Sequence, residues 1–410
     1  MAQIRPFKAI RPTRDKACLV ASRSYVTYNS VQLNDKLAGN PYTFIHILNP
    51  DHGKVEQAKG GTRELFGRIK DSFWDFVNDG ILKRDEQPAF YLYKQIRPDG
   101  ESIGLIATAH VDDYKNGKIR VHEQTISRRE NLFADYLDVT NFHAEPVLLC
   151  HDNNQELEAA YQRIMSQRPE CDFSTTDKCQ HQLWIIDENS LVENLIQQFK
   201  SIPALYIADG HHRSASSAQL ASQRSKLSKN DLHNWYMVYL IPASSLAIHG
   251  YHRLVKDLGG LSPEEFCSEI QKNNSLIPID QPDSHLGRGI INMYLDHQWY
   301  RISVLKELDD STIGAQWLTD HILKPILKIG DLRSDPRIRF RDGKRPKTIL
   351  ADEVDQKHAA CAFALHPVTF NELKGIADAG ATMPPKSTYI EPKLRSGLTI
   401  YTFEPEEENT

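Results

Sequence analysis

The sequence contains none of the short motifs that mark the commonest nucleotide-binding and hydrolase folds. There is no G-x-x-x-x-G-K-[ST] phosphate loop, no G-x-G-x-x-G turn, no G-x-S-x-G nucleophile elbow and no H-E-x-x-H helix. These absences disfavour P-loop, dinucleotide-binding, α/β-hydrolase and zinc-protease folds. Any nucleotide or substrate site must therefore be built from other residues.

Paired cysteines are also missing. None of the cysteines lies in a C-x-x-C pair, and several stand in apolar surroundings such as PVLLC and ACAFAL. The six are Cys18, Cys150, Cys171, Cys179, Cys267 and Cys361. This usage predicts buried, reduced thiols and disfavours a disulfide framework or a zinc site.

The sequence has neither a long apolar run nor an excess of positive charge. No uninterrupted apolar stretch approaches about 18 residues, and the amino terminus carries charges every few residues instead of a signal-peptide core. Lys and Arg total 49 against 54 for Asp and Glu, so the formal net charge of -5 provides no general attraction to nucleic acid or anionic membranes. We therefore expect a cytoplasmic protein without a membrane partner.

Length and composition predict a folded protein with more than one part. The chain has 410 residues, of which 40% are hydrophobic and 25% are charged, as in an average soluble protein. Strand-like and helix-like segments alternate without a repeat, which predicts a mixed α/β (α+β) fold. We expect a core with an amino-terminal elaboration at residues 1–255, an α+β portion that packs back on it at 256–403, and an acidic tail at 404–410.

Local signals indicate individual elements. Residues 89–96 and 102–111 flank a turn and read as a hairpin, and residues 43–48 read as a strand. Ser262 and Pro263 stand where the N-cap and the first residue of a helix are expected. A second hairpin is expected to turn at His297 and Gln298.

The most informative stretch is ALYIADGHHRSASS, residues 204–217. Residues suited to a buried strand lead into Asp209 and Gly210, and a helix rich in small residues follows. Asp209 is suited to cap the helix, while Gly210 permits a backbone conformation that other residues resist. The unpaired amides at the start of a helix bind anions readily, so the pattern predicts a phosphate or carboxylate site.

Side chains with suitable chemistry follow at once. Arg213 offers a planar fork for two anionic oxygens, and His211 or His212 is able to donate to a phosphate or carry a proton near neutral pH. The same residues also fit ordinary helix capping, because two adjacent histidines cannot both face inward. A metal site formed mainly by these residues is disfavoured, since they lack the i, i+4 spacing that puts two ligands on one helix face.

Two further segments carry candidate groups. In KIRVHEQTISRRE, residues 118–130, Glu123 stands beside His122 at the end of a short strand, an arrangement suited to a general base. In MPPKSTYIEPKLRSG, residues 383–397, prolines stiffen a run that carries Lys386, Lys393 and Arg395, which suits anion recognition. A charged turn at Glu123 and a plain extended crossover at 383–397 explain the two segments equally well.

The local candidate for nucleic-acid contact is RSDPRIRFRDGKRPK, residues 333–347. Arg337, Arg339 and Arg341 alternate along one face of a possible strand. Only Phe340 is interleaved with them for base stacking, so a solvated hairpin is the favoured interpretation.

These segments resemble a bacterial and archaeal family known as domain of unknown function 1015. The matching pieces are NPYTFIHI, EQPAFYLYKQ, VDDYKNGKIRVHEQT, LYIADGHHRSASS, RLVKDLGGLSPEEF, ILKPIL and MPPKSTYIEPKLRSGL, in this order over nearly the whole chain. One departure is SRSYVTYNS, which stands in place of a PPYDV-like element of the family and leaves the role of Tyr25 open.

The motif DGHHR is in turn similar to the D-G-H-x-R signature of the ParB and sulfiredoxin superfamily, which includes free-serine kinases, partition proteins and sulfiredoxins. The resemblance implies a ParB/sulfiredoxin-like nucleotide-binding core with extra hairpins, and it places nucleotide phosphates at Asp209, Gly210, His211 and Arg213. A histidine stands where sulfiredoxins need cysteine, and the helix-turn-helix segment of partition proteins is not found. Of these three branches, the resemblance therefore favours the free-serine kinases.

The resulting hypothesis is phosphoryl transfer from ATP or ADP, with Mg²⁺, to the hydroxyl of a small metabolite such as serine or a relative. We expect Glu123 to act as the base, Asp209 to lie near the metal or the accepting hydroxyl, and His211 to orient phosphate. Phosphate contacts are expected from Gly210, His212, Arg213, Ser214, Lys386 and Arg395. The alternative is a nucleotide-responsive regulator or nucleic-acid binder without kinase activity.

Overall fold

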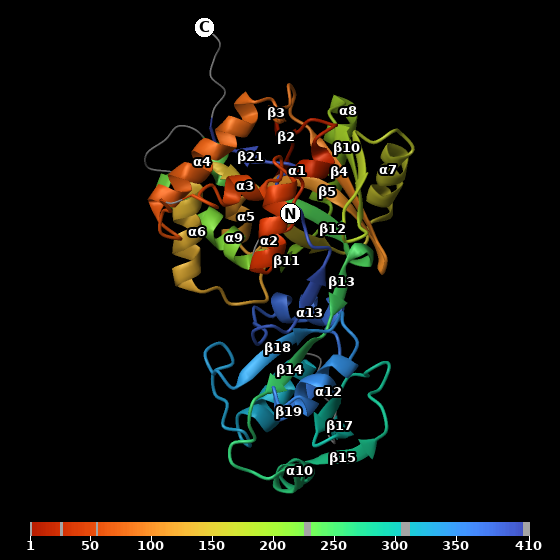
Figure 1. The fold of residues 1–410 in the computed structure, drawn as a ribbon. Coiled ribbons are helices and arrows are strands. Elements are labelled where there is room, and N and C mark those ends of the chain that lie inside the picture. Colours follow the sequence, from red (N-terminus) through yellow and green to blue (C-terminus); the bar gives the residue numbers. More distant parts are fainter. Residues whose placement is uncertain (1, 25–27, 55, 225–230, 305–311, 405–410) are drawn as a thin grey trace. The chain divides into compact units, whose positions relative to one another are not determined.

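The computed structural model describes residues 2–24, 28–54, 56–224, 231–304 and 312–404 (Figure 1). The chain divides into two compact units. The first comprises Met1–Val121, Thr125–Leu246 and Pro392–Thr410, and the second comprises His122–Gln124 and Ala247–Glu391. Apart from Glu404, the predicted acidic tail lies outside the described residues. The last part of the chain thus returns to the first unit.

A mixed sheet organises the first unit. Among the described residues it has nine strands in the order β6-β11-β8-β12-β5-β4-β10-β9, and β1 also pairs with β5. The strands are β1 (Ile4–Arg5), β4 (Phe90–Arg97), β5 (Gly100–His110), β6 (Ile119–Arg120), β8 (Val147–His151), β9 (Cys171–Ser174), β10 (Gln180–Ile186), β11 (Leu205–Asp209) and β12 (Trp235–Pro242). β11 runs parallel to β6 and antiparallel to β8, and β4 and β5 form the expected hairpin.

Helices and two small strand pairs complete the first unit. The helices are α1 (Ala17–Val20), α2 (Ser30–Gly39), α3 (Ile45–Leu48), α4 (Arg63–Asn78), α5 (Val111–Lys115), α6 (Ser127–Thr140), α7 (Gln155–Met165), α8 (Asn189–Lys200), α9 (His211–Arg224), η2 (Leu232–Asn234) and η3 (Ala243–Ser245). β2 (Ile10–Pro12) pairs with β3 (Leu82–Arg84), and β7 (Phe142–His143) pairs with β21 (Tyr401–Thr402). α6 and α9 pack against each other (Figure 1).

The two faces of the large sheet have different coverings. Successive side chains of a strand point to opposite faces. One set packs into a buried apolar cluster with α7, α8 and α9. Side chains of the other set meet the carboxyl-terminal segment: the Gln95 amide donates to the Lys393 carbonyl at 3.4 Å, and the Thr399 hydroxyl lies 3.6 Å from the Met237 sulfur. That segment therefore covers part of the face of the sheet opposite α7, α8 and α9.

The prediction of a strand at residues 43–48 is wrong. Ile45–Leu48 forms the short helix α3, and Phe44, Ile45 and Ile47 are buried. A short apolar run fits one turn of helix as well as a strand, because the burial pattern over so few residues does not separate the two periods.

The second unit contains an antiparallel sheet. Its six described strands lie in the order β15 (Asn274–Ile279), β17 (Gln298–Val304), β16 (Ile290–Leu295), β19 (Cys361–Ala364), β14 (Tyr251–Val255) and β18 (Ile338–Asp342). β13 (Ala247–His249) pairs with β20 (Tyr389–Glu391). The helices are α10 (Pro263–Gln271), α11 (Gly314–Leu318), the π-helical η4 (Thr319–Leu323), α12 (Thr348–Asp355) and α13 (Phe370–Asp378).

Two local predictions for this unit are confirmed. Ser262 caps α10 in a capping box with Glu265, and Pro263 is its first residue. β16 and β17 form the predicted hairpin, with Asp296 and His297 at positive φ in its turn, one residue before the predicted position. Helix capping and turn chemistry are local, so the sequence alone identifies them.

A buried arginine holds one loop of the second unit in place. Arg253 is fully buried, donates to the carbonyls of Tyr251 (2.8 Å), Lys386 (2.9 Å) and Pro385 (3.3 Å), and lies 4.6 Å from the ring centroid of Phe340. Burial lowers its pKa to about 9. Arg253 thereby fixes the backbone at Lys386, which has a φ of 57°.

No helix in the described part of the chain is long and apolar enough to cross a membrane.

Buried histidines make the first unit sensitive to acid. His151 is fully buried, and burial lowers its pKa from the usual 6.5 to about 4. Between these values the unfolded chain binds the proton more tightly, so stability falls as pH falls from about 6.5 towards 4, by on the order of 3 kcal/mol for this side chain.

We predict that His151→Gln flattens the pH dependence of the urea midpoint in this window. His52→Gln, at an exposed position, is the control for the substitution itself. Equal slopes for His151→Gln and wild type would contradict the assignment.

Candidate functional site

The site suggested by residues 204–217 lies where β11 ends and α9 begins. The pairing of β11 with β8 is irregular between Ile207 and Asp209, a local change of register that redirects the chain at this point. The first helical hydrogen bond runs from the amide of Ser214 to the carbonyl of Gly210 (3.0 Å). The preceding amides of α9 therefore have no acceptor within the helix.

Gly210 is required at this junction. Its φ is 105°, and a Cβ built there would lie 3.3 Å from both methyl groups of Val147 and 3.3 Å from Nε of Arg213. The predicted need for glycine thus has two causes, a backbone conformation that other residues resist and a close approach to β8. Small buried residues of α9, including Ser217 and Ala218, let the helix lie close to the sheet.

Arg213 is held by protein acceptors. Nη1 donates to the carbonyl of Pro146 at 2.5 Å and lies 3.0 Å from the carboxylate of Glu145, while Nη2 lies 3.9 Å from that of Asp209. These contacts tie the segment before β8 to the start of α9. A direct contact of Arg213 with phosphate stays a prediction, because a ligand would have to share this guanidinium with Glu145.

Two carboxylates and two cations meet at the junction. The Lys393 ammonium lies 3.6 Å from Asp209, and the Ser396 hydroxyl donates to Glu145 at 3.5 Å. Burial acts to raise the pKa of Asp209, but Lys393 and Arg213 outweigh it and the pKa is lowered. Burial raises the pKa of Glu145 in spite of Arg213. The two acids therefore have opposite tendencies to hold a proton.

The remaining predicted residues of the motif differ in accessibility. His211 is buried and His212 is half-buried. Ser214 is fully buried, and its amide is bonded to Gly210, so the structure gives its predicted phosphate contact no support. The roles predicted for His211 and His212 stay predictions.

Glu123 and Lys386 belong to the second unit. Glu123 is half-buried and follows His122, whose carbonyl accepts from the amide of Met383 at 2.8 Å. The Lys386 ammonium lies 5.4 Å from the ring centroid of Tyr251. Their roles as base and phosphate ligand stay predictions.

Arg395 lies in the first unit on the same segment as Lys393. Its Nη2 donates to Asp177 at 2.6 Å and to Thr175 at 3.1 Å, and its side chain is only 6% exposed. The sequence drew attention to this segment through its clustered cations, but it did not show that Lys393 pairs with Asp209. Glu145 was missed altogether, because no pattern in EPVLLC distinguishes it from any acid before a strand.

The described residues contain no cluster of three or more His, Cys, Asp or Glu side chains able to hold a metal ion alone. Asp209 nevertheless fits Mg²⁺ bound together with a nucleotide, because Mg²⁺ can take a single carboxylate and complete its shell with phosphate oxygens and water.

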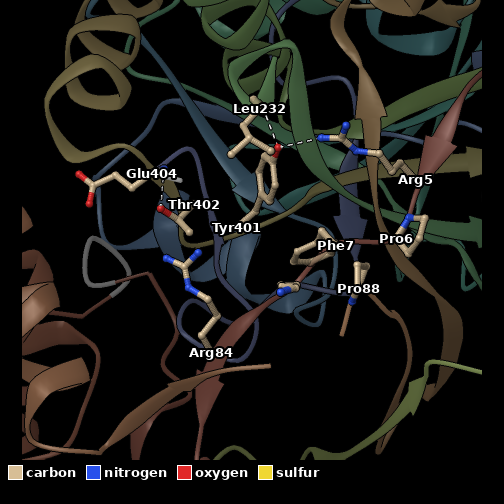
Figure 2. A pocket seen from close by; sticks show the side chains of 10 residues that line it. Arg5, Pro6, Phe7, Arg84, Pro88, Leu232, Tyr401, Thr402 and Glu404 are labelled. Carbon is tan, nitrogen blue, oxygen red and sulfur yellow. Dashed lines mark hydrogen bonds between the residues drawn. The ribbon is translucent and has the colours of Figure 1, made fainter. Parts of the chain in front are cut away.

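A separate hollow of about 520 Å³ lies elsewhere in the first unit (Figure 2). Pro6, Phe7, Pro88 and Tyr401 form much of its wall. The Tyr401 hydroxyl donates to the carbonyl of Leu232 at 2.7 Å. None of the residues predicted for the site lines this hollow.

The arginines of the basic stretch 333–347 are paired with acids. Arg339 lies 3.1 Å from Glu353, which also pairs with Arg341, and Arg337 lies 2.8 Å from Asp335. Three arginines thus share two acids, so part of their charge is offset within the second unit. The nucleic-acid alternative stays a prediction.

Residues 4–328 match the model of a family described as "Protein of unknown function (DUF1015)". The chain belongs to this family. The match ends before the segment that carries Lys393 and Arg395. No curated protein matches the chain.

Several solved structures are similar to the chain at low identity. A free serine kinase in complex with AMP aligns at 11% identity and a TM-score of 0.37, covering 72% of this chain and 91% of that chain. SbnI with a C-terminal truncation, from Staphylococcus aureus, aligns at 12% and 0.38, covering 72% and 87%. A conserved hypothetical protein from Pyrococcus furiosus aligns at 12% and 0.36, covering 72% and 94%. Scores at this level do not decide the fold or the chemistry.

The close approach at Gly210 predicts a stability effect. Gly210→Ala should lower the free energy of unfolding by about 1–3 kcal/mol, because φ is positive and the added methyl group meets Val147 and Arg213. Gly67→Ala is the control: Gly67 lies within α4 with nothing within 4 Å of its added Cβ, and the change should stabilise by about 1 kcal/mol. Urea unfolding measures both. A neutral Gly210→Ala would show that the junction does not need glycine.

Proposed function

We propose that the protein binds a nucleotide at the β11–α9 junction and transfers a phosphoryl group to the hydroxyl of a small metabolite, serine or a related compound. The observation that carries the proposal is the meeting of helix amides, the Lys393 ammonium and the carboxylates of Asp209 and Glu145 around a glycine. The similarity of DGHHR to the ParB and sulfiredoxin signature supports the same assignment.

Phosphate recognition is assigned to the amides of α9 and to Lys393. Helix amino termini favour anions through the helix dipole and the direction of their N–H groups. The side chain of Lys393 is 36% exposed and that of Asp209 is 46% exposed. Exposed ion pairs contribute little to stability, so Lys393 can move from Asp209 to a phosphate at small cost.

Phosphoryl transfer also needs a ligand for the metal ion and a base, and carboxylates are suited to both roles. Asp209, whose pKa is lowered, stays ionised and is suited to hold Mg²⁺ against the phosphates. When bound, Mg²⁺ neutralises phosphate charge. The loss of an acceptor's hydroxyl proton needs a base, for which Glu123 was predicted. Glu145, whose pKa burial raises, is a second candidate in the first unit.

Nucleotide binding is the first test. Calorimetric titration of the full chain with ATP, ADP and AMP, with and without Mg²⁺, should detect binding, and Lys393→Met should weaken it by about tenfold or more through loss of a charged contact. Lys94→Met is the matched control, since Lys94 forms a similar pair with Glu101 at 2.9 Å on β4 and β5. Absence of binding to wild type, or equal affinity in the two variants, would contradict the nucleotide assignment.

Turnover identifies the base. With ATP or ADP, Mg²⁺ and serine or another small hydroxyl compound, the protein should form a phosphorylated product. The Gln variant of the true base, Glu123→Gln or Glu145→Gln, should lower kcat by about 100-fold or more with little change in KM for the nucleotide, and the other variant should retain most activity. Full turnover in both variants would exclude both carboxylates.

A further inference from the structure

A second hollow in the first unit surrounds Arg395. It has a volume of about 400 Å³ and is lined by parts of α1, α2, the turn between β9 and β10, and the carboxyl-terminal segment. Its charged and aromatic lining includes Arg23, Tyr28, Lys36, Asp177 and Arg395. The volume is in the range of pockets that hold small ligands.

Arg395 is a buried cation that lines this hollow. Its side chain is only 6% exposed, and Nη2 is bound to Asp177 and Thr175. A buried charge is costly unless opposite charges or polar groups surround it, and a ligand anion in the hollow would add to these.

The charges around Arg395 do not cancel. Asp177 is shared between Arg395 at 2.6 Å and Arg23 at 3.0 Å. Burial acts to raise the pKa of Asp177, but the Thr175 hydrogen bond and the two arginines lower it to about 2, so it carries a full negative charge near neutral pH. Two guanidinium groups against one carboxylate leave one positive charge. The hollow is also lined by Asp35 and Lys36, one acid and one base whose formal charges sum to zero.

The scaffold holds this arginine rigidly. Thr175 donates to Asp177 at 2.5 Å and lies 3.1 Å from Nε2 of His181, whose Nδ1 lies 2.7 Å from the Tyr93 hydroxyl. Tyr93 and His181 are buried in β4 and β10. The anchor of Arg395, in the turn between β9 and β10, is thus tied to the central sheet through His181, as expected of a preorganised binding group.

We propose that this hollow binds the acid group of a small metabolite, a carboxylate or a phosphate, against Arg395 and Arg23. Both groups present oxygen atoms that a guanidinium fork binds in a bidentate manner. This assigns Arg395 a ligand other than the nucleotide expected from the sequence. The inference stands whether or not the protein transfers phosphoryl groups.

Simple probes test the proposal on the full chain without nucleotide. Inorganic phosphate, acetate and L-serine each carry an acid group, while ethanolamine carries an ammonium and a hydroxyl without one. By calorimetry, phosphate or the carboxylates should bind with a Kd in the millimolar range or tighter, and ethanolamine should not. Preference for phosphate over acetate and serine, or the reverse, identifies the kind of acid group.

Variants locate the binding. Arg23→Met should weaken it by about tenfold or more, because one of two charged contacts is lost. Arg11→Met is the control, since Arg11 is a similarly paired arginine, 2.8 Å from Asp85, that does not line the hollow. The proposal is overturned if no acid-bearing probe binds, or if Arg23→Met binds as tightly as wild type.

A second measurement avoids replacing the buried Arg395 in the test sample. The arginine Nε–H signals of wild type are followed by NMR, and Arg395→Lys serves only to assign the signal. Addition of the bound probe should shift the Arg395 Nε–H resonance as an anion binds against its guanidinium, while that of Arg11 stays in place. An unmoved Arg395 signal with the probe bound would place the ligand elsewhere. Inorganic phosphate is also expected at residues 210–213, so the Arg395 signal, and not the heat of binding, assigns phosphate to this hollow.

Discussion

The attachment of the carboxyl-terminal segment to the first unit is the constraint on which the rest depends. Ser396 and Ser22 exchange backbone hydrogen bonds of 2.8 and 3.1 Å, and Gly397, with a φ of 81°, lies so close to Phe44 that a Cβ would approach the ring to 2.5 Å. This docking carries Lys393 to Asp209 and Arg395 to Asp177. Both cations come from the end of the chain, so neither site exists until the chain has folded back.

The charges at the β11–α9 junction are brought together by the docking of this segment. Two carboxylates and two cations share a partly buried corner. Their surroundings shift the two carboxyl pKa values in opposite directions: that of Asp209 is lowered and that of Glu145 is raised. Pairs of acids separated in this way are typical of sites where one group stays ionised while the other exchanges a proton. Arg213 contributes by holding Glu145 and the segment before β8 against α9. Its part in the site is thus at least that of a positioning residue.

The sequence predicted what local chemistry determines. The turn from β11 into α9, the need for Gly210, the hairpin of β4 and β5 and the cap of α10 at Ser262 all appear in short stretches of residues. Contacts between distant segments were not predictable, since a single sequence carries no sign that Lys393 meets Asp209 or that Glu145 lies beside Arg213. The strand expected at residues 43–48 was wrong for a related reason, because a short apolar run does not determine its own period.

The central claim is that the start of α9 is a cradle for nucleotide phosphates. Its most direct test is amide NMR of the full chain during titration with ATP or ADP in the presence of Mg²⁺, following the backbone N–H signals of residues 210–213. The account predicts that these signals show the largest shifts and that inorganic phosphate competes for them. Shifts confined to the hollow around Tyr401, or unchanged signals at 210–213 with nucleotide bound, would contradict it.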